Sequence, residues 1–508
     1  MKAWLFRLFK YFPVGTVLFP LFICFHGANY VFDWIKLQDV LYFLFNSYLS
    51  ILILFVLIWF ITGPVYNATI LSFAFVVSFF CFGYVQDVLA GIIPMLSKPR
   101  FTIAIIGIII FSVHIWVKRT SLRRKIKVNY INNLIITAVT LFDLCIVLFH
   151  SSNTKASQVK FYDTRIANIQ APAKEEYTQQ KPDVYFIVFD EYASSQALKQ
   201  NFDFDNDELD TFLRGRGFYI ADKAKSNYAV TAFSIASTFN MNYFKDWNAL
   251  MYPNDFPAVC AAMKNNTLFR FFKKEGYSIY NYSIFNFEEA PSLYVDIERD
   301  LGMSAMLSYA LTERVDFKLL INKLFKLKPY QQMGIIDVLH NVEEDKKNNT
   351  TAPKFFYIHI LLPHSPFIFN KDGSLKSVFG MTSKQEMMGT DSYLDQLVYT
   401  NKIIKKFILR LQETKKKQII IVEGDHGFRN AQTYKGKKIP KTYYTQGEYF
   451  KNLNAFYFYD QKYEALYDSI SPVNTFRVVL NNYFGQQIPL LKDSSFVKKG
   501  IFRSVDFD

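Results

Sequence analysis

The chain has 508 residues, more than one ordinary domain needs and enough to bury a sizeable core. Its hydrophobic content of 51% and aromatic content of 18% are high for a fully soluble protein and low for one that lies entirely in a membrane. The net charge is +14, but no basic stripe with interleaved aromatic residues occurs, so we do not expect a nucleic-acid partner. We expect a membrane protein with a solvated basic domain.

Five apolar segments precede residue 150, and each approaches the ~20 residues needed to cross the hydrocarbon core of a bilayer. They cover approximately residues 13–32, 41–62, 68–90, 101–117 and 132–148. Lysine and arginine precede the first segment and cluster at 118–127, between the fourth and fifth. Because positive loops favour the cytoplasmic side, we expect a multi-pass protein of the cell (inner) membrane with a cytoplasmic N-terminus.

One acidic residue, Asp143, falls inside the fifth segment. An unpaired charge at that depth is costly, and a functional role is one interpretation. A protonated or hydrogen-bonded acid inside the helix bundle explains it equally well, so we assign Asp143 no role.

Three regions follow from these patterns: a transmembrane domain of residues 1–150, a polar linker of residues 151–180, and an extracytoplasmic domain of residues 181–508. In the last region, strand-like runs alternate with helical patterns, which predicts an α/β domain with a mainly parallel sheet covered by helices on both faces. Helices are expected at 207–216, 266–275 and 390–414, a strand within 277–285, and a helical, charged surface excursion at 314–349.

Three strand-like runs carry residues that can bind a metal ion. The runs are 181–195, with Asp190 and Glu191; 418–428, with Asp425 and His426; and 354–367, with His359 and His364. Ligands of open α/β sheets gather at the carboxyl ends of the strands. These side chains are therefore expected to meet at one edge of the sheet.

A hydroxyl-rich stretch, residues 226–242, could supply a nucleophile. Thr231 begins a segment whose spacing, with Ser234 and Ser237, fits the start of a helix packed on the sheet. A helix N-terminus offers free N–H groups to an anion, and a threonine there could attack phosphorus after losing its proton near a metal. Alternatively, Thr231 only caps the helix and the two serines are small packing residues.

Together, two carboxylates, one imidazole and one hydroxyl form a plausible set of four ligands for one divalent metal. The predicted ligands are Asp190, Thr231, Asp425 and His426. Oxygen and nitrogen donors of this kind suit zinc or manganese, with magnesium possible. An Asp-His-Gly turn is also often purely structural.

The remaining candidates are weaker. His359, inside a strand, is more typical of a satisfied core histidine, whereas His364 follows Pro363 at the strand end, where a substrate phosphate or a second metal could be met. Arg429 and Arg477 could bind phosphate, but a single arginine is a weak signal.

Taken in order, these motifs resemble the alkaline phosphatase/sulfatase superfamily, and more narrowly its membrane-anchored lipoteichoic acid synthases and phosphoethanolamine transferases. Proteins of that branch have five spans followed by an extracytoplasmic α/β catalytic domain. The resemblance implies that Asp190, Asp425 and His426 bind the metal. It also implies that Thr231, which heads a Thr-Ala-Phe-Ser segment, is both nucleophile and ligand, and that His364, and less strongly His359, contacts substrate phosphate.

Three departures from the family patterns narrow this expectation. The Cys-x-Pro-x-Arg nucleophile motif of sulfatases is absent, which argues against sulfate ester hydrolysis. The cysteines that surround the nucleophile in many phosphoethanolamine transferases are also absent. No histidine follows His426, so a late histidine ligand of those transferases is missing, and a one-metal site like that of lipoteichoic acid synthases fits better.

The resemblance implies a metal-dependent transferase that moves a phosphoglycerol-type or phosphoethanolamine-type head group through a phosphothreonine intermediate. The donor would be a membrane phospholipid and the acceptor a cell-envelope glycan or lipid, with no protein partner implied. Two alternatives stay open: a phosphodiesterase or phosphatase of the same superfamily, for which water is the acceptor, and a non-catalytic membrane binding protein.

Overall fold

The structure is a computed structural model, and it falls into two compact units that are described separately below. It describes residues 2–31, 37–93, 99–153, 160–161, 181–245, 256–283, 285–293, 338, 341–346, 352–365, 367–376, 389–414, 416–429, 431, 433–435, 437–439, 442–443 and 447–496. The expected linker and the expected excursion at 314–349 lie mostly outside these residues, and the predicted domain boundaries stay predictions.

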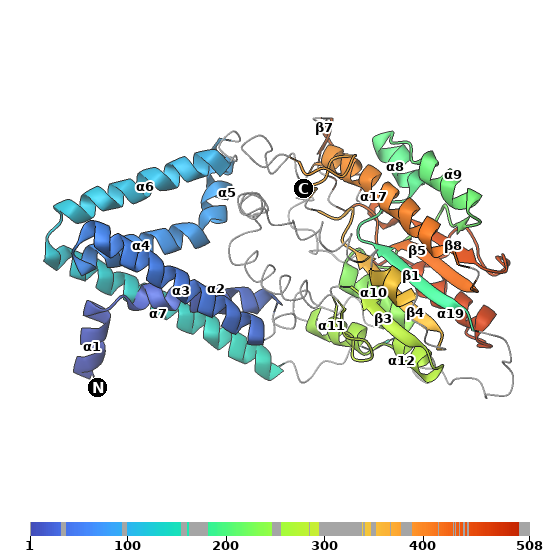
Figure 1. Ribbon diagram of the computed structural model, residues 1–508, viewed down its shortest axis with the longest axis horizontal. Coiled ribbons are helices and arrows are strands. Elements are labelled where there is room, and N and C mark those ends of the chain that lie inside the picture. The colour runs from blue at the N-terminus through green and yellow to red at the C-terminus, as the bar shows by residue number, and fades with distance from the viewer. Residues whose placement is uncertain are drawn as a thin grey trace. The chain divides into compact units, whose positions relative to one another are not determined.

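The N-terminal unit consists of helices in the residues described (Figure 1). They are α1 (Lys2–Tyr11), α2 (Val14–Val31), α3 (Leu37–Thr62), α4 (Val65–Phe80), α5 (Phe82–Ile92), α6 (Pro99–Arg119) and α7 (Leu122–Asn153). Judged by length and composition, three described stretches could cross a membrane: Phe43–Thr62, Phe101–Arg119 and Leu122–Phe149. The apolar helical stretches Val14–Gly27 and Val65–Phe80 are shorter.

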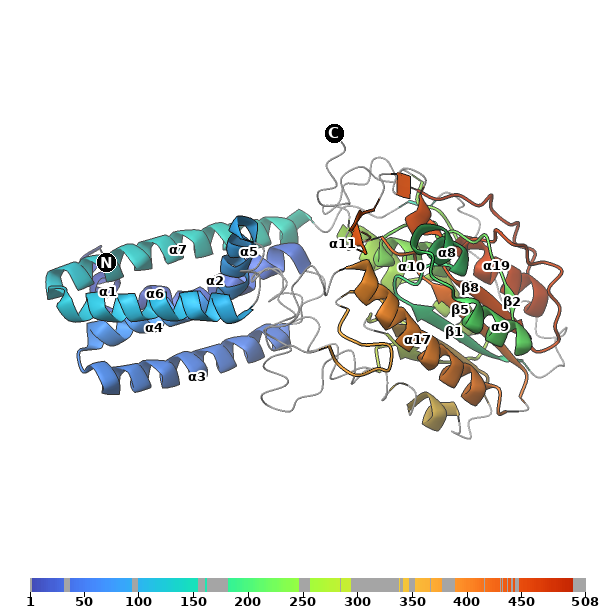
Figure 2. The ribbon, with the colours of Figure 1, turned by 90° about the horizontal axis from the view of Figure 1, so that it is seen from above.

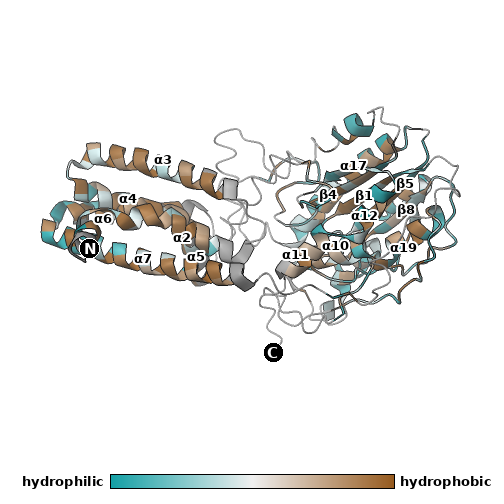
Figure 3. Cartoon of the chain, turned by 90° about the horizontal axis from the view of Figure 1, so that it is seen from below, coloured by the Kyte–Doolittle hydropathy of each residue, from teal (hydrophilic) through white to brown (hydrophobic). Residues whose placement is uncertain are grey.

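Large hydrophobic side chains lie on the outside of these helices. Phe60 and Ile61 in α3 are 79% and 78% exposed, and Phe142 in α7 is 67% exposed. Hydrophobic colour dominates most of this unit (Figure 3). Helices with apolar residues on their outer faces are what a hydrocarbon environment requires.

The expected span at 68–90 is divided in the structure. Helix α4 ends at Phe80, Cys81 follows with backbone dihedrals φ −95° and ψ 8°, and α5 begins at Phe82. Helix α5 carries Gln86 and Asp87, which are costly to place in hydrocarbon. Three spans are therefore supported by length, and the count of five stays a prediction.

Polar side chains inside this unit form hydrogen bonds with backbone and side-chain groups. The amide of Asn133 in α7 donates to the Phe12 carbonyl at 2.7 Å and accepts from the Gly15 backbone N–H at 2.6 Å, which ties down the connection from α1 to α2. Asp143 lies 3.1 Å from the ring nitrogen Nδ1 of His26 in α2. This contact agrees with the interpretation of Asp143 as a paired acid inside the bundle.

The second unit is built on a six-stranded sheet with the order β2-β8-β5-β1-β4-β3. The strands are β1 (Asp183–Phe189), β2 (Tyr219–Ile220), β3 (Ser278–Tyr282), β4 (Lys354–Ile360), β5 (Gln418–Gly424) and β8 (Asn454–Phe458), and β6 (Thr433–Tyr434) and β7 (Lys437–Lys438) form a separate pair. Strands β3, β4, β1 and β5 are parallel, as expected. Strand β8 runs antiparallel to β5 and β2, so the sheet is mixed, although its other five strands run in the same direction.

Helices cover both faces of this sheet (Figures 1 and 2). They are α8 (Ser195–Phe202), α9 (Asp207–Gly215), α10 (Thr231–Asn240), α11 (Phe256–Lys264), α12 (Thr267–Lys274), α17 (Thr390–Leu411) and α19 (Pro472–Tyr483), with a 3-10 turn, η4, at Glu448–Phe450. On one face, Phe186 of β1 packs edge-on against Phe239 of α10 and Phe476 of α19. The helices expected at 207–216, 266–275 and 390–414 are confirmed.

The register of the three central strands determines which residues meet at the edge of the sheet. Phe189, the last residue of β1, pairs with Gly424, the last residue of β5. Asp190 and Asp425 are the next residues of two neighbouring parallel strands, so the chain delivers both carboxylates to the same place.

Candidate metal centre

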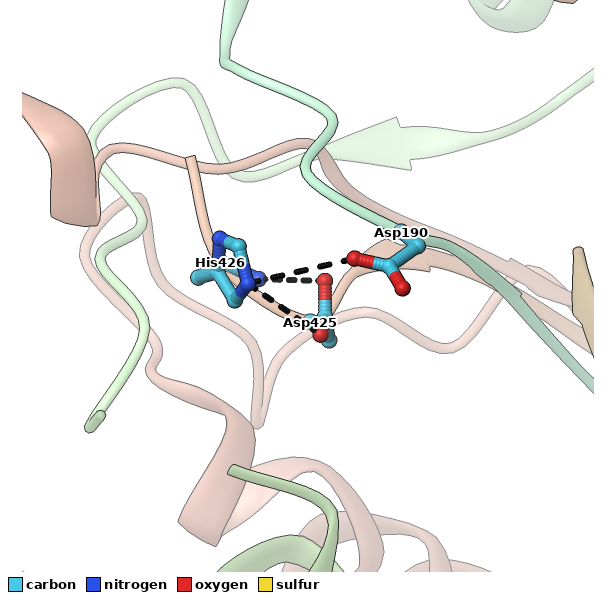
Figure 4. A group of neighbouring side chains, drawn as sticks. All are labelled: Asp190, Asp425 and His426. Atoms are coloured by element: carbon cyan, nitrogen blue, oxygen red, sulfur yellow. Dashed lines mark hydrogen bonds and ion pairs between the residues drawn. The ribbon is translucent and has the colours of Figure 1, made fainter. Parts of the chain in front are cut away.

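Asp190, Asp425 and His426 form one buried cluster at the carboxyl ends of β1 and β5 (Figure 4). One potential ligand atom from each residue lies within 4.8 Å of the others. The nitrogen Nε2 of His426 is 3.5 Å from Oδ2 of Asp425 and 3.9 Å from Oδ1 of Asp190. Sequence spacing predicted this meeting of the three residues.

Backbone groups fix the orientation of the Asp425 carboxylate. Its oxygen Oδ1 accepts hydrogen bonds from the backbone N–H groups of Glu191 at 3.0 Å and His426 at 2.9 Å. Its other oxygen, Oδ2, is buried and has no hydrogen-bond partner among the described residues. One oxygen is therefore held by the protein while the other is available to a cation.

The same division holds for His426. Its nitrogen Nδ1 lies 2.8 Å from the Gly427 carbonyl oxygen, so this nitrogen carries the proton. Nε2 then presents a lone pair, and it too is buried without a partner among the residues described, as is Oδ1 of Asp190. Three buried acceptor atoms that converge unpaired would each cost about 1–3 kcal/mol, and a divalent cation would satisfy all three.

Burial and neighbouring charge disfavour the charged forms of Asp190 and His426 while no cation is bound. Burial, followed by the neighbouring Asp425 carboxylate, raises the pKa of Asp190 to about 7. Burial, with a further contribution from Arg429, lowers the pKa of His426 to about 3, which keeps its imidazole neutral. Two carboxylates forced together and a neutral imidazole form a site that is electrostatically incomplete without a cation.

Gly427 is required because neighbouring backbone comes very close. A Cβ atom at this position would lie 2.4 Å from the carbonyl oxygen of Lys451 and 2.8 Å from that of Tyr449. No side chain fits there, so the glycine keeps the Asp-His turn packed against the segment that leads into β8.

Thr231 is the first residue of α10, and the N-cap position belongs to Val230, whose backbone is extended. The cap interpretation of Thr231 is therefore wrong. One turn further along the same helix face, the Ser234 hydroxyl donates a hydrogen bond to the Asp425 carbonyl oxygen at 2.6 Å. This bond anchors the first turn of α10 beside the cluster, whereas the Ser237 hydroxyl donates to the Asn242 carbonyl at the other end of the helix.

The two histidines of β4 and the loop after it occupy different environments. His359 is buried, with Nδ1 2.7 Å from the Tyr357 hydroxyl and Nε2 3.8 Å from Oδ2 of Asp190, and burial lowers its pKa to about 4. The side chain of His364 is 26% exposed. Burial acts to lower the pKa of His364, but the charges of Asp190 and Glu191 outweigh it and the net direction is upward. Only His364 is partly exposed, while Nε2 of the buried His359 has no hydrogen-bond partner among the described residues. Substrate contact by either histidine stays a prediction.

Sequence reasoning underrated Arg429. Its backbone N–H donates to Oε1 of the buried Glu191 at 3.0 Å, and its guanidinium donates to the Ala229 carbonyl at 2.8 Å. The signal in the sequence was its position, two residues after the Asp-His-Gly turn. The other arginine considered, Arg477, is fully buried and donates to the Met241 carbonyl at the end of α10, far along the helix from Thr231.

The fold and the cluster together define an α/β protein with apolar N-terminal helices and a strand-end site that a divalent metal fits. The sequence model of the sulfatase family matches residues 154–476, well over half of the chain. The protein therefore belongs to the sulfatase family.

Several solved structures are similar at low sequence identity. The integral membrane phosphoethanolamine transferase EptA from Neisseria meningitidis is 11% identical over 92% of this chain and 95% of that chain, with a TM-score of 0.42. The C-terminal periplasmic domain of EptC from Escherichia coli is 10% identical over 62% and 85%, with a TM-score of 0.40. The lipoteichoic acid synthase LtaP from Listeria monocytogenes is 13% identical over 62% and 76%, with a TM-score of 0.34. No curated protein matches the sequence.

Proposed function

We propose that the protein is a membrane-bound, metal-dependent transferase that moves a phospho-alcohol head group from a phospholipid to an envelope glycan or lipid. The observation that carries this proposal is the convergence of three unpaired acceptor atoms, on Asp190, Asp425 and His426, beside the helix that begins with Thr231. Membership of the sulfatase family supports chemistry on an esterified oxyanion.

In this proposal the N-terminus is cytoplasmic, residues 1–150 lie in the membrane, and residues 181–508 form an extracytoplasmic catalytic domain after a linker. The long apolar helices support the membrane assignment. Anchoring the catalytic domain to the bilayer raises the effective concentration of a lipid donor.

Asp190, Asp425 and His426 would hold the metal, with the Thr231 hydroxyl as the fourth ligand. A divalent ion bound there would lower the pKa of the hydroxyl and neutralise charge on the phosphoryl oxygens. Zinc and manganese suit the nitrogen and oxygen donors, and magnesium would rely on the carboxylates.

Thr231 Oγ1 forms a bond to the phosphorus of the donor while the phosphorus–oxygen bond to diacylglycerol breaks. Diacylglycerol leaves as an alcohol and takes up the proton that Thr231 lost. The acceptor hydroxyl then attacks the phosphothreonine, the bond from phosphorus to Oγ1 breaks, and Thr231 regains a proton. The reaction is a ping-pong exchange of one alcohol for another.

Intact mass of the solubilised full-length protein tests this chemistry. The protein is loaded with manganese, incubated with phospholipid vesicles and measured as wild type, Thr231→Ala and Thr231→Ser. Ser237→Ala is the matched control, because it removes a hydroxyl of the same helix that bonds away from the cluster.

We expect a phospho-alcohol mass increment on the wild type and on Ser237→Ala, a smaller amount on Thr231→Ser, and none on Thr231→Ala. The size of the increment identifies the head group. An increment that persists in Thr231→Ala contradicts the assigned nucleophile. Release of free phospho-alcohol, with no head group transferred to a glycan or lipid, would indicate a hydrolase instead of a transferase.

A further inference from the structure

The guanidinium of Arg429 links the Asp-His-Gly turn to the segment that enters α10. Its Nη1 donates to the carbonyl of Ala229, two residues before Thr231, at 2.8 Å. The carboxylate of Glu191 accepts from the Arg429 backbone N–H at 3.0 Å and lies 4.0 Å from its Nε. A buried acid of the first strand end therefore sets the position of the arginine.

His364 lies against the same guanidinium. Its Nδ1 is 2.6 Å from the Ser365 carbonyl oxygen, so the proton of the neutral ring sits on Nδ1 and Nε2 is an acceptor. Nη2 of Arg429 lies 3.4 Å from that Nε2. The hydrogen bonds made to described residues use one N–H of Nη1 and one of Nη2, and the Arg429 side chain keeps 21% of its surface exposed. Further N–H groups can therefore reach a ligand.

Charge decides between an anion and a second cation at this place. A guanidinium 3.4 Å from the imidazole would repel a metal bound to His364. Asp190, Glu191 and Asp425 carry three negative charges, and one divalent ion with Arg429 would balance all three. No net negative charge then opposes an incoming oxyanion, and a second metal is unnecessary.

We propose that Arg429 forms an oxyanion subsite beside the metal cluster, and that Glu191 and the acceptor nitrogen Nε2 of His364 position the arginine within it. The ligand class is a tetrahedral phosphoryl group: one non-bridging oxygen faces the metal cluster and the other accepts from the guanidinium. This inference rests on the proposed function and adds to it a residue that binds the phosphoryl oxyanion. A planar fork of N–H donors suits this task better than a lysine ammonium.

Binding of inorganic phosphate tests the subsite without any turnover. The full-length, manganese-loaded protein is titrated calorimetrically as wild type, Arg429→Gln, Arg429→Lys and Glu191→Gln. Arg214→Gln is the control, because Arg214 is an exposed arginine paired with Asp222. Manganese affinity is measured for each variant in parallel.

Arg429→Gln should weaken phosphate binding roughly 10- to 100-fold, the loss typical of a charge-assisted hydrogen bond. Arg429→Lys should fall between the glutamine variant and the wild type, Glu191→Gln should also weaken binding, and Arg214→Gln should leave it unchanged. Manganese affinity should stay the same in Arg429→Gln. If Arg429→Gln does not fold, Arg429→Lys carries the test.

Unchanged phosphate affinity in the Arg429 variants overturns the subsite, as does a loss of phosphate binding that only follows a loss of manganese. The Thr231 adduct separates this failure from failure of the proposed function. An intact adduct with arginine-independent phosphate binding removes the subsite and keeps the transferase. Arginine-dependent binding with no adduct on the wild type removes the transferase and keeps the subsite.

Discussion

Asp190→Asn should change stability in opposite directions without and with a metal ion. In the metal-free protein, burial and then the Asp425 carboxylate raise the pKa of Asp190 from 3.8 to about 7. The folded state therefore keeps a proton that the unfolded chain loses, and stability should fall as the pH rises from about 4 to about 7. Asparagine does not ionise, so the variant should lack this fall.

The size of the effect follows from the pKa. A difference of about 3 pKa units corresponds to about 4 kcal/mol above pH 7, at about 1.4 kcal/mol per unit. The buried amide of the variant, in a place shaped for a carboxylate, should cost about 1–3 kcal/mol of stability and offset part of this gain. Without metal at pH 8, the variant should therefore be more stable than the wild type by about 1–3 kcal/mol, or a few degrees in the unfolding midpoint.

Metal reverses the order. Manganese at about 1,000 times its Kd should stabilise the wild type by about 4.1 kcal/mol, whereas the variant, which lacks a ligand, should gain much less. The assay is thermal unfolding of the solubilised full-length protein at pH 5 and pH 8, with EDTA or with manganese. Asp222→Asn, at an exposed carboxylate, is the control. The reasoning is refuted if the EDTA-treated Asp190→Asn variant is the less stable protein at pH 8, or if manganese stabilises both equally.

Three further substitutions test how the fold supports the site. Ser234→Ala removes the hydrogen bond to the Asp425 carbonyl, which should cost about 1–2 kcal/mol of stability and weaken metal binding, measured by thermal unfolding and metal titration. Gly427→Ala would place a Cβ 2.4 Å from the Lys451 carbonyl oxygen. The turn must then move, and metal affinity should fall roughly 10- to 100-fold in the same titration. Arg477→Met leaves the Met241 carbonyl at the end of α10 and the Pro489 carbonyl without this donor, which should cost about 2–4 kcal/mol and lower the unfolding midpoint.

Each substitution has a control within the chain. Ser237→Ala removes a helix hydroxyl away from the cluster, so an equal loss of metal affinity there would contradict the argument for Ser234. Gly215→Ala adds a Cβ that meets nothing within 4 Å, and a Gly427 variant that behaves the same way would show that close packing does not shape the turn. Arg214→Met removes an exposed arginine and should leave the midpoint unchanged, in contrast to the buried one.

The convergence of Asp190, Asp425 and His426 could be predicted from the sequence because parallel strands bring their ends together. The runs before Asp190 and Asp425 are apolar, and a run buried on both faces pairs in parallel with similar runs. The register that places Phe189 beside Gly424 is an observation of the structure, because apolar runs alone do not fix it. The antiparallel strand β8 was not predicted, since an apolar run such as residues 454–458 does not show which way it points.

The membrane part was predicted less completely, for a different reason. Hydropathy averages over a window, and the window at 68–90 spans the change of conformation at Cys81. Gln86 and Asp87 lie in that window, and the surrounding hydrophobic residues outweigh them in the average. The polar contacts from Asn133 and Asp143 depend on which helices are neighbours, and no pattern within a single segment carries that information.

The acidic pair at the end of β1 shows most clearly what a sequence leaves out. Asp190 and Glu191 are adjacent acids in the sequence, with Asp190 the predicted ligand, and the structure places their carboxylates against different neighbours. Glu191 has a positive φ of 63°, which is uncommon for a residue with a side chain, and it turns its N–H toward Asp425. Its carboxylate then meets Arg429 instead of the metal cluster. The contact between Glu191 and Arg429 thus accompanies a backbone conformation that the sequence pattern does not reveal, and for this reason Arg429 was a weak candidate in the sequence.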